Sequence, residues 1–170
     1  TQEDRQIGKL LKELALQGLL DRTAIWLVSD HGEEFWEHWW NGHGANVFEE
    51  SVRTLSIFTD PPRLPMGKIV SEPVMHVDIF PTLIELFQWE APLLRQGKSL
   101  LPLIHGATEP EFDRRPVFLH HGGGNSAEAH ISDKEAVLRD GIKAIHWPEK
   151  NQWELYDLSS DPFEQTNRIQ

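Results

Sequence analysis

The segment SDHGEEFWEHWWNGHG, residues 29–44, gathers four carboxylates, three histidines and three tryptophans into sixteen positions. It directly follows AIWLV, residues 24–28, an unbroken apolar run that predicts a buried strand. Asp30 and His31 would then offer a carboxylate oxygen and an imidazole nitrogen at the end of that strand, and such a pair suits a divalent cation. The segment is therefore a candidate metal site.

Neighbouring side chains of a strand point to opposite faces, so Asp30 and His31 can reach one ion only if the chain leaves the strand there. Gly32 supplies the backbone freedom for this exit. The carboxyl ends of strands are also where open α/β sheets usually bind ligands. Two ligands leave the site incomplete, because calcium takes about six to eight oxygen ligands and zinc takes about four ligands.

The other polar and aromatic residues of the segment have a simpler interpretation. We expect Glu33, Glu34 and Glu37 to form a solvated acidic face. The three tryptophans either pack against neighbouring structure or line the mouth of a pocket, and packing is the favoured interpretation: Trp36, Trp39 and Trp40.

Helices and strands alternate in the first part of the chain. Apolar residues at i, i+3, i+4 and i+7 predict a helix within residues 7–20 that ends near Gly18. VRTLSIF, residues 52–58, predicts a second strand, and Asp78 is the expected N-cap of a helix over residues 78–87. This pattern indicates an α/β arrangement, and we expect residues 1–110 to form part of an α/β catalytic domain.

The remainder of the chain has a different pattern. Four short strand-like runs are separated by turn residues, which predicts an antiparallel β subdomain over residues 111–170. The runs are RPVFLHH, EAVLRDG, IKAIHWP and QWELYDL. The last two are expected to form a hairpin around residues 148–152.

Composition restricts the class of protein. The chain has 170 residues, enough for one globular domain with a small appendage. Its formal charge of -11 argues against nucleic acid as a partner, because phosphate binding needs a basic face. There is no cysteine, which excludes disulfides. No run approaches the roughly 20 apolar residues of a transmembrane segment.

Six sequence blocks, taken in order, resemble the carboxyl-terminal part of a sulfatase-family enzyme of the alkaline phosphatase superfamily. They cover nearly the whole chain. The resemblance implies an α/β fold, part of an alkaline phosphatase-like sandwich with a small carboxyl-terminal antiparallel β subdomain, and it implies hydrolysis of a sulfuric ester. The blocks are IGKLLKELALQGLLDRT, AIWLVSDHGEE, HGANVFEESVRTLSIF, VMHVDIFPTLIEL, GKSLLPLIHG and IKAIHWPEKNQWELYDLSSDPFEQTN.

The resemblance assigns expected roles to individual residues. Asp30 and His31 match the family's late pair of metal ligands, which hold one divalent cation; calcium is favoured, and manganese, magnesium and zinc are the alternatives. His43 matches a basic residue that contacts the anionic group of the substrate, so it is the expected catalytic and substrate-binding residue. Glu49 and Glu50 are expected to anchor the loop. Asp78 is expected to cap its helix.

The sequence also departs from the family pattern. The family nucleophile is a formylglycine made within a Cys/Ser-x-Pro-x-Arg motif, and SEPVM, residues 71–75, lacks the arginine. The early pair of metal-binding aspartates is absent too. The resemblance therefore implies that the chain begins partway through the enzyme. Its expected partners are an anionic ester substrate and the missing amino-terminal half, and alone it should be inactive and bind a divalent cation weakly or not at all.

Other functions remain open at this point. The same superfamily contains phosphodiesterases, phosphonate monoester hydrolases and phosphoethanolamine transferases. Members with two metals use further ligands, to which His120 or His121 could contribute, although a structural or pocket-rim role is favoured for both. A non-catalytic binding fragment is the third hypothesis. The resemblance is compatible with a periplasmic or extracellular location, and no signal peptide opens this segment.

Overall fold

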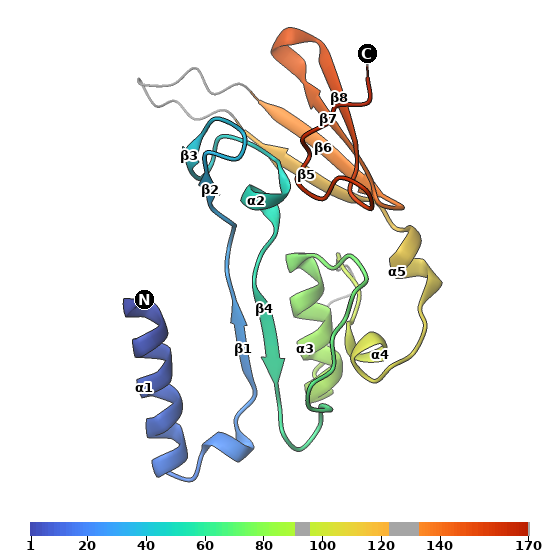
Figure 1. The fold of residues 1–170 in the computed structure, drawn as a ribbon. Coiled ribbons are helices and arrows are strands. Elements are labelled where there is room, and N and C mark those ends of the chain that lie inside the picture. The colour runs from blue at the N-terminus through green and yellow to red at the C-terminus, as the bar shows by residue number, and fades with distance from the viewer. Residues whose placement is uncertain (91–95, 123–132, 170) are drawn as a thin grey trace. The chain divides into compact units, whose positions relative to one another are not determined.

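The structure, a computed structural model, describes residues 1–90, 96–122 and 133–169. The chain divides into two compact units (Figure 1). The first comprises Thr1–Val28, Ser56–Ser71 and His76–Thr108, and the second comprises Ser29–Leu55, Glu72–Met75 and Glu109–Gln170. The expected domain boundary at residues 110 and 111 concerns the whole enzyme and stays a prediction.

The first unit contains α1 (Gln2–Leu16), the 3-10 turn η1 (Leu20–Arg22), β1 (Ile25–Val28), β4 (Ser56–Thr59), η2 (His76–Asp78), α3 (Ile79–Phe87) and α4 (Leu101–Ile104). The predicted first helix is confirmed. Thr1 caps it by accepting the N–H of Asp4, and the chain turns away at Gly18, whose φ is 66°. None of its residues is buried, and Leu10 and Leu16 are 58% and 73% exposed.

Strand β1 pairs with β4 in an antiparallel ribbon. Trp26 lies opposite Phe58, and their rings stack 4.2 Å apart. The predicted strand is thus present, but its side chains are half-buried or exposed rather than buried. Among the described residues, β4 is the one strand that pairs with β1, so β1 lies in a two-stranded ribbon rather than in the middle of a sheet.

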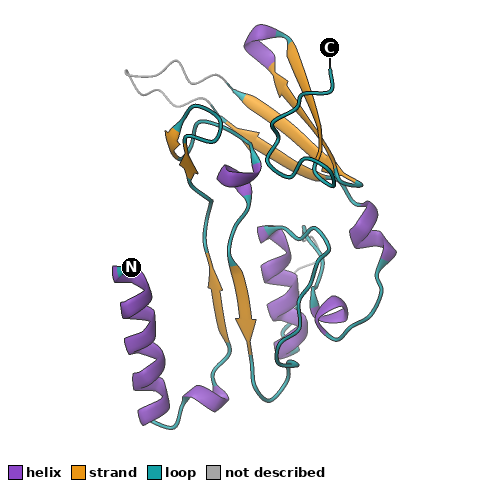
Figure 2. Ribbon diagram, in the orientation of Figure 1, coloured by secondary structure: helices purple, strands orange, loops and turns teal. Residues whose placement is uncertain are grey.

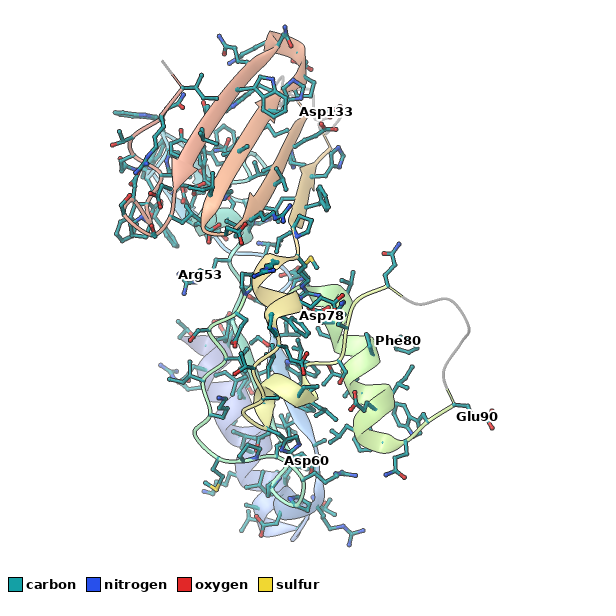
Figure 3. The ribbon with its side chains drawn as sticks, turned by 90° about the vertical axis from the view of Figure 1, so that its right-hand side faces the viewer. Arg53, Asp60, Asp78, Phe80, Glu90 and Asp133 are labelled. Atoms are coloured by element: carbon teal, nitrogen blue, oxygen red, sulfur yellow. The ribbon has the colours of Figure 1, made fainter. Side chains whose placement is uncertain are left out.

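Asp78 stands at the N-cap position of α3, as predicted (Figure 3), but its side chain makes no capping hydrogen bond to the helix. Instead, Oδ1 of Asp78 accepts the backbone N–H of Lys98 at 2.9 Å. The hydroxyl of Thr82 accepts the N–H of Leu100 at 2.9 Å. These bonds tie the loop before α4 to α3. Among the described residues, no helix combines the length and apolarity needed to cross a membrane.

The second unit contains β2 (Glu34–Phe35), β3 (Asn41–Gly42), α2 (Glu49–Val52), α5 (Pro110–Arg114), β5 (Val117–His121), β6 (Lys134–Arg139), β7 (Ile142–Trp147), η3 (Pro148–Lys150) and β8 (Gln152–Asp157). The last four strands form the predicted antiparallel sheet in the order β5-β6-β7-β8 (Figure 2). The predicted hairpin is confirmed as well, with η3 at its turn. Most of the glycine-rich loop between β5 and β6 lies outside the described residues.

One face of this sheet supplies the core of the second unit. Ala136, Ile145 and Tyr156 pack there against Val47 and Phe48, which belong to the loop between β3 and α2. Strand alternation places two lysines, at positions 134 and 143, on the same face. The loop that follows the candidate metal ligands is therefore seated on the sheet.

Candidate functional site

The two ends of the loop that carries the candidate site are joined by hydrogen bonds. Ser29 donates its N–H to the carbonyl of Leu55 at 3.1 Å, and the N–H of Leu55 donates to Oγ of Ser29 at 2.9 Å. Gly32 donates its N–H to the carbonyl of Ser51 at 2.8 Å. A Cβ on Gly32 would lie 2.0 Å from the carbonyl oxygen of Glu50, so only glycine allows this approach.

Asp30 and His31 follow the end of β1, where the chain leaves the strand as predicted. Nδ1 of His31 lies 2.7 Å from the carbonyl oxygen of Gly32. Because a carbonyl only accepts, Nδ1 carries the proton and Nε2 of the neutral ring keeps its lone pair. This Nε2 lies 3.6 Å from Oδ1 of Asp30. One nitrogen and one carboxylate oxygen are therefore placed side by side.

This donor set fits a divalent cation in chemistry but not in number. A metal-binding histidine commonly donates its second ring N–H to a carbonyl, and His31 does so with Gly32. The described part of the chain holds no group of three His, Asp or Glu residues arranged to bind a metal ion. Further ligands would have to come from elsewhere.

His43 lies next to this pair. Its ring stacks on the ring of His31, with centroids 4.3 Å apart and planes 29° apart. Nδ1 of His43 is 3.2 and 3.3 Å from the two carboxylate oxygens of Glu33. Both side chains are about half-exposed. Glu33 thus orients His43, leaving Nε2 of the ring as the nitrogen available to a ligand.

The two adjacent glutamates at the start of β2 differ completely in environment. Glu33 faces His43, whereas Glu34 is fully buried and accepts hydrogen bonds from Asn46 and Ser51. The expectation of a solvated face was therefore wrong for Glu34. Neighbouring residues of an extended segment point to opposite sides, so one carboxylate turns outward and the next turns inward. Glu37 is exposed, as expected.

The tryptophans of the loop are more exposed than predicted. Trp36 and Trp39 are 68% and 90% exposed, and Trp40 is 36% exposed. Trp36 and Trp39 have φ angles of 74° and 66°, which place both in the left-handed region between β2 and β3. Packing within the described residues therefore does not explain these two side chains.

Two buried lysines hold the ends of the segment that follows His43. Nζ of Lys134 donates to the carbonyl of Ala45. Nζ of Lys143 lies 3.1 Å from Oε1 of Glu49 and 2.9 Å from Oε1 of Glu164. Burial lowers the pKa of Lys134. The predicted anchoring role of Glu49 is borne out by this contact.

His38 is a residue whose role sequence reasoning missed. Its ring stacks on Phe48 at 3.7 Å, Nδ1 contacts Glu50, and Nε2 lies 3.0 Å from the carbonyl of Glu164. Burial alone would lower the pKa of His38, but the hydrogen bonds and charges of Glu50 and Glu164 outweigh it and raise the pKa. No local pattern signals this role, because Glu164 lies 126 residues away in the sequence.

The two histidines at the end of β5 lie on opposite faces of the sheet. His120 is exposed, whereas His121 lies opposite Lys134. Nε2 of His121 is buried without a hydrogen-bond partner among the described residues. Burial lowers the pKa of His121. Their contribution to a second metal stays a prediction.

Known proteins match both the sequence and the fold. Residues 36–170 match the family model described as N-sulphoglucosamine sulphohydrolase, C-terminal. N-acetylglucosamine-6-O-sulfatase of Bacteroides thetaiotaomicron is 32% identical over 96% of this chain, which covers 29% of that enzyme.

Two solved structures are similar as well. One is described as a complex with its substrate D-glucosamine-2-N,6-O-disulfate; it has a TM-score of 0.86 and 31% identity, and the match covers 96% of this chain and 33% of that one. Phosphonate monoester hydrolase of Agrobacterium radiobacter has a TM-score of 0.78 and 27% identity, with 96% and 34% covered. The chain thus spans about a third of the length of these relatives. It belongs to the sulfatase family, within the alkaline phosphatase superfamily, and corresponds to the carboxyl-terminal part of such an enzyme.

Proposed function

We propose that the protein carrying this chain hydrolyses sulfuric esters, and that Asp30, His31 and His43 belong to its active site. The observation that supports this most strongly is the stacking of His43 on His31 beside Asp30. It places two potential metal-binding atoms and a basic side chain together on one loop of a sulfatase-family chain.

Each residue has a separate task in this proposal. Asp30 and Nε2 of His31 bind one divalent cation, for which calcium is the favoured candidate and manganese, magnesium and zinc are the alternatives. A bound cation would offset negative charge on the ester oxygens. His43, held by Glu33 through Nδ1, donates a hydrogen bond from Nε2 to the anionic group or to the leaving oxygen.

The remaining parts of the active site are proposed to come from upstream polypeptide. By family membership this part would supply the formylglycine nucleophile and the other metal ligands. The exposed leucines of α1 support such a partner, because an amphipathic helix normally buries its apolar side. A covering polypeptide would complete both the core and the metal site.

Substitutions in the full-length protein test the proposal. We expect Asp30→Asn and His31→Gln to raise the divalent-ion concentration needed for activity, and His43→Gln to lower kcat about 100-fold or more because a proton or charge donor is lost. His105→Gln, at an exposed position after α4, is the matched control. Wild-type activity in the first three variants would exclude these residues from the site.

A second candidate function is hydrolysis of phosphonate monoesters. The similarity to a phosphonate monoester hydrolase favours it specifically. Both reactions use an anionic, tetrahedral group, so the residues of this chain alone do not separate them. Measuring kcat/KM with 4-nitrophenyl sulfate, a glucosamine sulfate and 4-nitrophenyl phenylphosphonate separates the two functions, and we expect the sulfate esters to be preferred.

A further inference from the structure

Glu164 lies in the turn after β8, and only 1% of its surface is exposed. Its Oε2 accepts the backbone N–H of Glu49 at 2.6 Å, at the first residue of α2. Its Oε1 lies 2.9 Å from Nζ of Lys143 on β7. Its backbone carbonyl accepts from Nε2 of His38 at 3.0 Å. One residue therefore joins α2, the sheet and the loop between β2 and β3.

The turn that carries Glu164 is fixed to the sheet. Oδ1 of Asn167 accepts the N–H of Leu155 at 3.0 Å, and the N–H of Arg168 donates to the carbonyl of Leu155 at 2.8 Å. Glu164 itself has a φ of 52°, in the left-handed region. A residue other than glycine keeps this conformation only where its surroundings impose it. The turn is thus a defined attachment point on β8.

From α2, the contacts continue to the candidate metal ligands. The carbonyl of Ser51 accepts the N–H of Gly32, and the carbonyl of Glu50 occupies the space beside Gly32 that a Cβ would need. Asp30 and His31 directly precede this glycine. Because α2 has only four residues, it has little stability of its own, and its position depends on contacts at its ends.

We propose that Glu164 is a positioning residue that fixes the Asp30–His31 pair through α2 and Gly32. Its carboxylate acts as the N-terminal cap of α2, and its ion pair with Lys143 ties that cap to the sheet. The inference rests on the proposed function only in one respect, which is that Asp30 and His31 bind a metal ion. The contacts of Glu164 with α2, and those of α2 with Gly32, are independent of any activity.

Amide hydrogen exchange of the 170-residue chain, followed by NMR, tests whether Glu164 holds Gly32 in place through α2. We expect the Gly32 amide to exchange about tenfold faster in Glu164→Ala, because the cap and the ion pair are both lost. Glu164→Gln should have a smaller effect, since its amide oxygen can still accept the N–H of Glu49. Glu135→Ala is the control, at a side chain that is 60% exposed on the other face of the sheet.

The full-length protein provides the second measurement. We expect the divalent-ion concentration that gives half-maximal activity to rise about tenfold in Glu164→Ala, less in Glu164→Gln, and not at all in the control. Unchanged exchange at Gly32, or equal acceleration in the amides of β6, would overturn the proposal. So would faster exchange at Gly32 together with an unchanged metal requirement, provided that Asp30→Asn alters this requirement. If Asp30→Asn alters nothing, the proposed function fails, while selective acceleration at Gly32 still supports the positioning contact.

Discussion

His38 has an acceptor at each of its ring nitrogens. The carbonyl of Glu164 can only accept, so Nε2 must carry a proton, and the carboxylate of Glu50 is best satisfied when Nδ1 carries one too. The structure therefore favours the imidazolium form, in agreement with the raised pKa of His38. Burial alone would raise the pKa of Glu50, but the hydrogen bond from His38, with smaller contributions, outweighs burial and lowers it.

These shifts predict how stability depends on pH. A raised histidine pKa contributes stability that is complete below the unfolded value of 6.5 and is lost as the pH rises through the folded pKa. The lowered pKa of Glu50 contributes above 4.5 and is lost as the pH falls through its folded value. We expect the His38–Glu50 contact to stabilise the chain fully between these two values, with His38→Gln costing about 1.5–3 kcal/mol there, as for a hydrogen bond to a charged group.

Urea unfolding at several pH values measures this effect. The difference in the free energy of unfolding between wild type and His38→Gln isolates the His38–Glu50 contact. Glu164, whose pKa is raised by burial, titrates in both proteins, so its contribution cancels in this difference. His120→Gln, at an exposed position on the other face of the sheet, serves as the control. The interpretation fails if the difference stays constant, or grows, as the pH is raised above 6.5.

Gly32 gives a second prediction at the residue scale. Gly32→Ala forces a Cβ to within 2.0 Å of the Glu50 carbonyl, and we expect a loss of about 1–3 kcal/mol in the free energy of unfolding. Gly8→Ala is the matched control, because nothing lies within 4 Å of its Cβ position and alanine favours a helix by about 1 kcal/mol. Chemical denaturation should therefore show opposite signs for the two substitutions, and equal signs would contradict the close contact.

At the scale of elements, the loop after His43 is held at both ends by buried lysines. Lys143→Ala would leave Glu164 and Glu49 without their cation, and we expect it to cost about 3–5 kcal/mol, as for one partner of a buried ion pair. Lys143→Met combined with Glu164→Gln removes both charges and should be much less destabilising. Thermal unfolding of Lys143→Met, Glu164→Gln and the double variant compares them, and additive losses would show that the ion pair matters little.

The sequence predicted those elements whose signals are local. The strands of the sheet and the turn at residues 148–150 follow from alternation and turn residues, and the first helix follows from its apolar spacing. The buried roles of Glu34 and His38 could not be predicted in this way, because their partners are distant in sequence. The side chain of Asp78 bonds across 20 residues for the same reason, rather than capping α3.

The proximity of the candidate site residues was predicted only in part. Asp30 and His31 are neighbours in the sequence, so their side chains come together only if the chain leaves the strand at this point. The glycine at position 32 signals this change of conformation in the sequence. The stacking of His43 on His31 and its pairing with Glu33 depend instead on the turn between β2 and β3. Two tryptophans adopt left-handed conformations in that turn, which no residue preference would suggest.

At the scale of the whole molecule, the candidate metal site is open and incomplete within the described residues. Asp30 and His31 have side chains that are 89% and 42% exposed, and the described residues hold no group of three His, Asp or Glu side chains arranged to bind a metal ion. A divalent cation that exchanges part of its water shell for only two exposed ligands gains little binding free energy. We therefore expect the 170-residue chain to bind calcium, manganese or zinc weakly or not at all and to show no turnover of sulfate esters, as isothermal titration and a discontinuous sulfate-release assay would measure.

Adding the upstream polypeptide of the same protein, by co-expression, distinguishes an incomplete site from a wrong one. If the ligands are shared, the combined polypeptides should bind the ion with a single site, and Asp30→Asn should abolish that binding without preventing association. The exposed apolar side of α1 should become protected from exchange or proteolysis in the same complex, because that surface then leaves water. Tight, stoichiometric binding of the ion by the 170-residue chain alone would contradict this division of the site between two parts of the enzyme.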